Sequence, residues 1–157
     1  MQLQLNSRET ALLKAVAEAA AKIGVPAFAV GGFVRDKILE RPTKDIDVVC
    51  IGDGMALAQA FSKLFHPNPP VSLFKTFGTA QVKFDDIEIE FVGARKESYS
   101  DDSRNPDVTE GTLQDDQNRR DFTINALALS LNDENFGELL DPFNGIEDLE
   151  NKIIKTP

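Results

Sequence analysis

Residues 27–51 read AFAVGGFVRDKILERPTKDIDVVCI, and this stretch decides the fold. The apolar run at residues 27–30 predicts a short buried strand, and the Gly31-Gly32 pair predicts a turn after it. Residues 33–39 have the pattern of a short helix, and residues 46–51 have that of a second buried strand. The order strand, glycine turn, helix, strand indicates a domain of the α/β (α+β) class.

Further helices and strands surround this unit. We expect helices at residues 7–23, 55–65, 119–131 and 146–149, strands at 71–74, 79–84, 87–92 and 139–140, and a long polar loop at 95–118. Ser7 can cap the first helix, and Gly24 can end it. Only Asp85-Asp86 separates residues 79–84 from 87–92, so these strands are predicted to form a hairpin. The result is a small mixed sheet with flanking helices.

Composition limits the class of protein. The chain has 157 residues, of which 41% are hydrophobic, so residues 1–157 can form one domain with its own core. The net charge of −9 argues against a domain that grips nucleic acid through its overall field. The single cysteine, Cys50, and the lack of a signal-peptide pattern or of a long apolar stretch predict a cytoplasmic protein with no membrane partner.

Two aspartates begin the second predicted strand. Because a strand projects residues i and i+2 from the same face, Asp45 and Asp47 aim two carboxylates at one point. Metal-assisted phosphoryl or nucleotidyl transfer needs a further carboxylate. The hairpin register offers Glu88 and Glu90, and Glu88 lies opposite Lys83, which leaves Glu90 the better candidate. Solvated acids at the start of a strand are the competing interpretation of the aspartate pair.

The glycine turn and a nearby arginine form a second candidate feature. Gly31 and Gly32 allow backbone N–H groups to approach a phosphate chain at a helix start, and Arg35 is placed to reach a terminal phosphate. A tight turn beside a surface arginine has the same sequence pattern. The glycine pair gains its weight from its position just before the two aspartates.

A third candidate feature is the segment Arg119-Arg-Asp-Phe-Thr-Ile-Asn125. On a helix, Asp121 and Asn125 would share one face. Arginines at a helix start oppose the helix dipole, so they call for a compensating anion, either Asp116 or a nucleotide triphosphate. A surface cluster of ion pairs is the alternative explanation.

Three segments together resemble the catalytic head of the bacterial and eukaryotic tRNA nucleotidyltransferases and their poly(A) polymerase relatives. They are Ala29-Val-Gly-Gly-Phe-Val-Arg-Asp36, Lys44-Asp-Ile-Asp47 and Arg119-Arg-Asp-Phe-Thr-Ile-Asn-Ala-Leu127, followed by Asp141-Pro-Phe-Asn-Gly-Ile-Glu-Asp148. The resemblance extends from about residue 26 to residue 157. It implies a polymerase β-like nucleotidyltransferase fold and, in the longer family members, neck, body and tail domains after the head.

The resemblance also implies roles for individual residues. Asp45, Asp47 and Glu90 match the carboxylates that bind two catalytic Mg²⁺ ions. The residues that match nucleotide contacts are Gly31, Gly32, Arg35, Arg120, Asp121 and Asn125. The implied partners are CTP, ATP and the 3′ end of a tRNA, which the other domains would mainly hold.

The leading hypothesis is metal-dependent transfer of nucleotides from CTP and ATP to a tRNA 3′ end. Two alternatives stay open, namely a poly(A) polymerase that uses only ATP and a nucleotide-binding module that is inactive by itself. A glycosyltransferase with an Asp-x-Asp metal site is a more distant alternative, since its chemistry does not explain residues 119–127.

Overall fold

The computed structural model describes residues 3–98 and 107–157. In chain order its elements are α1 (Ser7–Ile23), β1 (Ala27–Val30), α2 (Gly32–Ile38), β2 (Asp45–Cys50), α3 (Gly54–Ser62), β3 (Val71–Phe74), β4 (Thr79–Phe84), β5 (Ile87–Gly93), β6 (Arg95–Ser98), β7 (Asp107–Glu110), α4 (Leu113–Asn118), the 3-10 helix η1 (Thr123–Asn125), β8 (Ala128–Ser130), β9 (Leu139–Leu140) and α5 (Gly145–Glu150). The strand, glycine turn, helix and strand predicted at residues 27–51 are confirmed.

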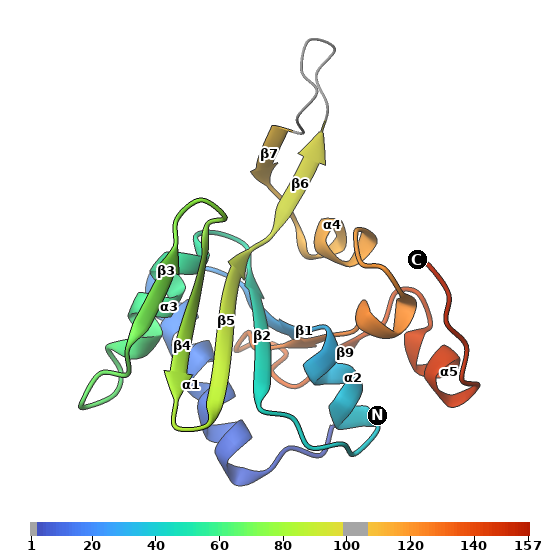
Figure 1. Cartoon of the computed structure of the whole chain (residues 1–157), viewed down its shortest axis with the longest axis horizontal. Coiled ribbons are helices and arrows are strands. Elements are labelled where there is room, and N and C mark those ends of the chain that lie inside the picture. Colours follow the sequence, from blue (N-terminus) through green and yellow to red (C-terminus); the bar gives the residue numbers. More distant parts are fainter. Residues whose placement is uncertain (1–2, 99–106) are drawn as a thin grey trace.

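The main sheet is mixed. Its strand order is β3-β4-β5-β2-β1-β8-β9, and β2 and β5 form a parallel pair while their other neighbours are antiparallel. The strands β6 and β7 form a separate antiparallel pair that rises from one end of the main sheet (Figure 1). The predicted β4–β5 hairpin is confirmed, since Phe84 pairs with Ile87 across the two-residue turn. This topology brings the catalytic candidates on β2 and β5 next to each other.

One face of the sheet carries the main hydrophobic core. Helices α1 and α3 lie behind the sheet in the view of Figure 1, and their apolar side chains pack against every second residue of the central strands. Ile46 and Val48 of β2, together with Ile89 and Phe91 of β5, are at most 2% exposed in this core. Because side chains alternate along a strand, Asp45, Asp47, Glu88 and Glu90 project from the opposite face.

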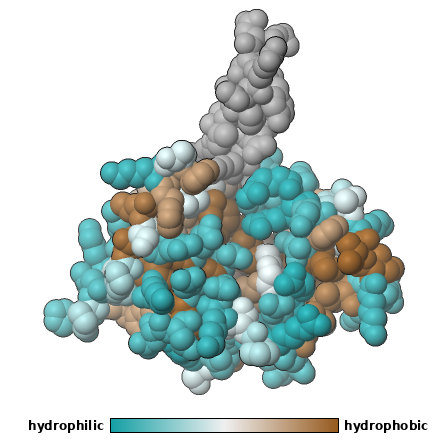
Figure 2. Space-filling model, in the orientation of Figure 1, coloured by the Kyte–Doolittle hydropathy of each residue, from teal (hydrophilic) through white to brown (hydrophobic). Residues whose placement is uncertain are grey.

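That opposite face is only partly covered. A second apolar cluster includes Phe28, Val30 and Val49, and Leu113 of α4 and Leu140 of β9 pack against it. This cluster lies along β1 and β2 and leaves the beginning of β2 uncovered, where Asp45 is exposed. Figure 2 shows that hydrophilic side chains cover much of this face, and that hydrophobic ones gather in two places, near α5 and the C-terminal segment at the right and in the region of β3 and β4 at the left.

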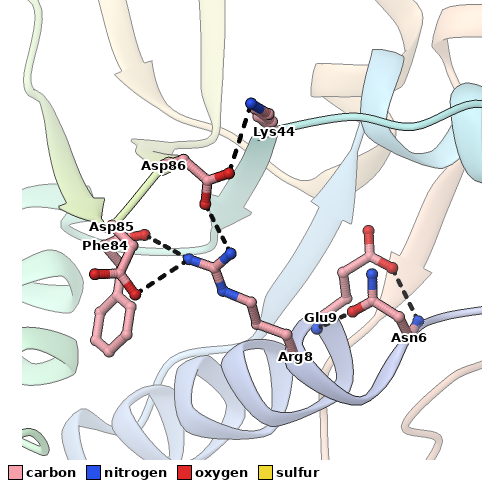
Figure 3. A network of polar contacts seen from close by, with 7 residues as sticks. All are labelled: Asn6, Arg8, Glu9, Lys44, Phe84, Asp85 and Asp86. Atoms are coloured by element: carbon pink, nitrogen blue, oxygen red, sulfur yellow. Dashed lines mark hydrogen bonds and ion pairs between the residues drawn. The ribbon is translucent and has the colours of Figure 1, made fainter.

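Helix α1 begins and ends at local signals. Asn6, rather than the predicted Ser7, caps the helix, and Gly24 ends it with a left-handed backbone at φ 72°. Arg8 at the start of α1 bonds Asp86 at 2.7 Å in the β4–β5 turn, and Asp86 also contacts Lys44 at 3.5 Å (Figure 3). The hydrogen bond from the Arg8 guanidinium lowers the pKa of Asp86. These exposed ion pairs connect α1 to the residue just before Asp45.

Two predictions in the C-terminal half are wrong. The expected helix at residues 119–131 is instead a turn after α4, the short helix η1 and strand β8. Strand β8 pairs with β1 and β9, so contacts with distant strands replace the local helical pattern. The expected loop at 95–118 contains β6, β7 and α4, and residues 99–106 of it lie outside the described residues.

Among the helices in residues 3–98 and 107–157, none is long and apolar enough to span a lipid bilayer.

Candidate active site

The parallel pairing of β2 with β5 places four carboxylates in two rows. Asp45 pairs with Glu88, and Asp47 pairs with Glu90. On its other side, Glu90 pairs with Gln81 of β4, as the hairpin register predicted. Asp45 and Glu88 are exposed, whereas Asp47 and Glu90 are half-buried. The structure therefore brings Asp45, Asp47 and Glu90 to one face of neighbouring strands, with Glu88 beside them.

Asp47 has an unfavourable environment for its negative charge. Burial raises the pKa of the Asp47 carboxyl above its ordinary value of 3.8, and the neighbouring charges of Glu90, Asp45 and Asp116 raise it further. The Arg120 guanidinium opposes this shift by lowering the pKa. Carboxylates that repel one another in a partly buried position are stabilised by a bound cation.

The donor set fits a hard divalent cation. Carboxylate oxygens are the ligands that Mg²⁺ prefers, and Mg²⁺ sites usually use only one or two protein carboxylates together with substrate phosphates. Within the described residues, no three His, Cys, Asp or Glu side chains are already gathered closely enough to hold a metal ion by themselves. Asp45, Asp47 and Glu90 thus present ligands from adjacent positions without forming a closed protein cage.

The glycine turn lies directly beside Asp47. Gly31 adopts φ 70° and ψ −140°, a backbone conformation that L side chains rarely adopt, and its N–H donates to the Leu127 carbonyl at 3.3 Å. A Cβ atom on Gly31 would stand 3.4 Å from Nη1 of Arg120 and 3.6 Å from Oδ2 of Asp47. Gly31 therefore lies between a carboxylate and a guanidinium that come from distant parts of the chain.

Arg35 in α2 lies beside the second glycine. A Cβ atom on Gly32 would stand 3.3 Å from Nη2 of Arg35. The other nitrogens of Arg35 are bonded, since Nε donates to Asp36 at 3.1 Å and Nη1 donates to the Asn125 side chain at 2.7 Å. These two bonds fix the guanidinium so that Nη2 remains on the side of the glycine turn.

Asp121 and Asn125 contact each other, although no α-helix connects them. The Asn125 side chain donates to Oδ1 of Asp121 at 3.1 Å, and this bond lowers the pKa of the exposed Asp121 carboxyl. The same oxygen accepts the backbone N–H of Phe122 at 2.9 Å. The predicted proximity of the two side chains is confirmed, but a turn leading into η1 produces it. Asn125 then connects Asp121 to Arg35.

Asp116 is the site residue that the sequence-based site assignment did not include. It is only 1% exposed, and it accepts bonds from Arg119 at 2.8 Å and from Nε and Nη2 of Arg120 at 3.2 and 3.0 Å. The sequence does contain a signal for this contact. Asp116 lies three and four residues before the two arginines, and positions with these spacings share a helix face. Asp116, one of the two anions expected beside these arginines, contacts both of them.

The candidate residues thus form one connected group. Gly31, Gly32, Arg35 and Arg120 surround the turn after β1, and Asp47 with Glu90 lies next to it on β2 and β5. The group comes from four separate segments of the chain, and each segment is held by the sheet or by side-chain hydrogen bonds. Carboxylates that can bind a metal cation therefore lie beside arginine side chains that can bind phosphate.

Comparison with known proteins agrees with this arrangement. The profile of the poly A polymerase head domain matches residues 27–155. An A-adding tRNA nucleotidyltransferase of Aquifex aeolicus is 41% identical over 130 residues, which cover 83% of this chain and 16% of the relative. A CC-adding tRNA nucleotidyltransferase of Deinococcus radiodurans is 38% identical over 133 residues, which cover 80% of this chain and 33% of the relative.

A solved structure extends the likeness to three dimensions. A tRNA nucleotidyltransferase complexed with a primer tRNA and an incoming ATP analog matches 90% of this chain and 38% of its own, with a TM-score of 0.77 and 37% identity. The predicted nucleotidyltransferase fold, a small mixed sheet with flanking helices, is confirmed. The chain spans well under half the length of these relatives. Over the part that they share, it belongs to the poly A polymerase head-domain family.

Proposed function

We propose that residues 1–157 act as the catalytic head of a tRNA nucleotidyltransferase, which adds nucleotides from CTP and ATP to a tRNA 3′ end and releases pyrophosphate. The observation that carries this proposal is the position of Asp47, beside Glu90 on one side and beside Gly31 and Arg120 on the other. Residues that would hold a metal ion and residues that would bind phosphate must be adjacent in nucleotidyl transfer, because the charge that the metal would stabilise lies on the transferred phosphate.

Asp45, Asp47 and Glu90 would hold two Mg²⁺ ions. When bound, these ions supply the positive charge that stabilises both the attacking and the leaving oxygen of an in-line displacement. Glu90, or a metal-bound hydroxide, would accept the proton of the tRNA 3′-hydroxyl as that oxygen attacks the α-phosphate. The partly buried position of Asp47 strengthens its attraction to cations, because screening by water is weaker there.

The remaining site residues would bind the nucleotide. Arg35 and Arg120 would donate hydrogen bonds to the β- and γ-phosphates, which carry the charge of the leaving pyrophosphate. Gly31 and Gly32 allow the phosphate chain to approach the backbone, where any larger side chain would intrude. Asp121 and Asn125 would complete the nucleotide site, Asn125 by holding Arg35 and Asp121 by holding Asn125.

The relatives bear on the substrate. The Aquifex aeolicus protein adds A and the Deinococcus radiodurans protein adds CC to tRNA, by their names, and both are much longer than the matched part. We expect base choice and most tRNA contacts to depend on neck, body and tail domains of the kind that follow the head in this family. A tRNA substrate also agrees with the cytoplasmic location expected from composition.

Two alternatives share the same site. A poly(A) polymerase would keep the chemistry but use only ATP, and a nucleotide-binding module would bind Mg²⁺ and ATP without turnover. Calorimetric titration of the chain with ATP and Mg²⁺, run beside a turnover assay, separates binding from catalysis.

The direct test incubates the intact protein with Mg²⁺, a tRNA that ends before its CCA, and either labelled CTP or labelled ATP. The proposal expects nucleotide addition to the 3′ end, and the CTP and ATP reactions distinguish C addition, A addition and both. If neither nucleotide were added although the chain bound both, the binding-module alternative would replace the proposal.

A further inference from the structure

The buried carboxylate of Asp116 has two guanidinium partners. One oxygen accepts a bond from Arg119, and the other accepts two bonds from Arg120, through Nε and Nη2. Arg119 is 43% exposed and Arg120 is 23% exposed, so Asp116, at 1%, is the group that is fully removed from water. Burying a carboxylate is unfavourable unless it is paired, and a buried ion pair is by itself weak evidence for a stabilising role. The burial of Asp116 beside two arginines therefore needs an explanation other than stability.

The bonds to Asp116 fix one side of the Arg120 guanidinium. Nε and Nη2 both face Asp116, and the remaining nitrogen, Nη1, is the atom nearest to a Cβ position on Gly31. Arg35 shows the same arrangement, since Nε and Nη1 are bonded and Nη2 lies nearest to Gly32. Each of the two arginines thus presents one nitrogen to the glycine turn while side-chain acceptors hold its other two.

Asp116 also competes with Asp47 for Arg120. Oδ2 of Asp47 and Nη1 of Arg120 both lie within 4 Å of one point, the Cβ position on Gly31. Without its bonds to Asp116, the guanidinium could turn and form a two-point pair with the Asp47 carboxylate, which is the stronger geometry for arginine. Such a pair would occupy oxygens that the proposed metal ligand needs and would withdraw Nη1 from the phosphate position.

We propose that Asp116 is a positioning residue, which holds Arg120 in the orientation that leaves Nη1 for the nucleotide phosphates and leaves Asp47 for the cation. This role rests on the proposed function of the site. It acts through Arg120 alone, so its loss should have no effect where Arg120 is already absent.

The test measures the binding of magnesium tripolyphosphate to the chain by calorimetry, at several Mg²⁺ concentrations. Tripolyphosphate is the probe because it has the phosphates of a nucleotide without the base or ribose. Asp116→Asn should weaken binding by about tenfold, the effect of one well-oriented charge-assisted bond, and should raise the Mg²⁺ concentration needed for half-saturation. In an Arg120→Gln chain, Asp116→Asn should cause no further loss.

Glu9→Gln is the matched control. Glu9 is 3% exposed and is paired with Lys37 at 2.5 Å, so this variant also removes a buried charge, but one whose partner is a lysine outside the proposed site residues. It should bind tripolyphosphate within about twofold of the unmodified chain, which separates loss of stability from loss of orientation. If Asp116→Asn does not fold, Arg120→Lys replaces it, because lysine keeps the charge but lacks the planar guanidinium, whose separate nitrogens let Asp116 fix the direction of Nη1. Arg120→Lys should then bind as weakly as Arg120→Gln.

Three results would contradict the role of Asp116. The first is that Asp116→Asn binds tripolyphosphate as tightly as the Glu9→Gln control. The second is that Asp116→Asn weakens binding in the Arg120→Gln chain as much as it does in the unmodified chain. The third is that Arg120→Lys binds as tightly as the unmodified chain. Failure of the unmodified chain to bind magnesium tripolyphosphate would contradict the proposed phosphate site itself, and the role of Asp116 with it.

Discussion

Asp47 and Glu90 are direct neighbours on the parallel strands β2 and β5, and both project from the sheet face opposite the main core. Through this pair, the β4–β5 hairpin contacts the unit of β1, α2 and β2 that contains the glycine turn. Two half-buried acids in such positions repel each other, so the fold itself maintains an attraction for cations at this point. The same repulsion makes the stability of the chain sensitive to the charge on Asp47.

Stability should depend on the ionisation of Asp47. Its pKa in the folded chain lies above the ordinary value of 3.8, so the folded state holds this proton more tightly than the unfolded state does. Binding of this proton therefore stabilises the folded state at low pH. That stabilisation is lost as the pH rises from the ordinary pKa through the raised one. Asp47→Asn should be more stable than the unmodified chain at pH 7 and equally stable near pH 3, measured by urea unfolding in metal-free buffer. A constant difference across that range would contradict the prediction.

Glu90 and Glu88 provide a matched pair for the third carboxylate. Both lie on the same face of β5, but Glu90 pairs with Asp47 whereas Glu88 pairs with Asp45 and is exposed. Glu90→Gln should lower the rate of nucleotide addition by the intact protein by about a hundredfold, as loss of a metal ligand or of a positioned base does. Glu88→Gln should change the rate by only a few fold. Equal losses would show that the register does not select the third ligand.

Gly31 should not tolerate a side chain. Gly31→Ala must adopt the unfavourable backbone at φ 70° and ψ −140°, which costs about 1–3 kcal/mol of unfolding free energy. Its methyl group would also fill the space between Arg120 and Asp47 and so weaken binding of magnesium ATP. Gly24→Ala is the control, because Gly24 also has a positive φ, 72°, but no atom within 4 Å of a Cβ position. Gly24→Ala should lose stability, as chemical unfolding would show, and keep its affinity for ATP.

Much of the fold could be predicted because its signals are local. The alternation in residues 79–92 and the two-residue Asp85-Asp86 turn were sufficient to predict the hairpin and its register. The glycine pair between an apolar run and a short helix was sufficient for the unit that contains Gly31. The hairpin register also favoured Glu90 over Glu88 as the third carboxylate, and the resemblance agreed with that choice.

The C-terminal half could not be predicted in the same way. Phe122, Ile124 and Leu127 have spacings that fit a helix, but residues 128–130 form a strand because β1 offers an unpaired edge far away in sequence. The acids before Arg119 suggested a solvated loop, whereas Asp116 is buried because two arginines neutralise it. Both errors have one cause, since single-sequence patterns do not contain the long-range partner that decides the outcome.

The most direct test of the account compares Asp45→Asn and Asp47→Asn with Asp53→Asn in the intact protein, as the rate of nucleotide addition to a tRNA that lacks its CCA. Asp53 caps α3, where asparagine caps equally well, so this variant controls for the loss of one carboxylate. Each of the first two variants should lose at least about a hundredfold in rate. Rates for both that stay within a few fold of the Asp53→Asn control would contradict the account.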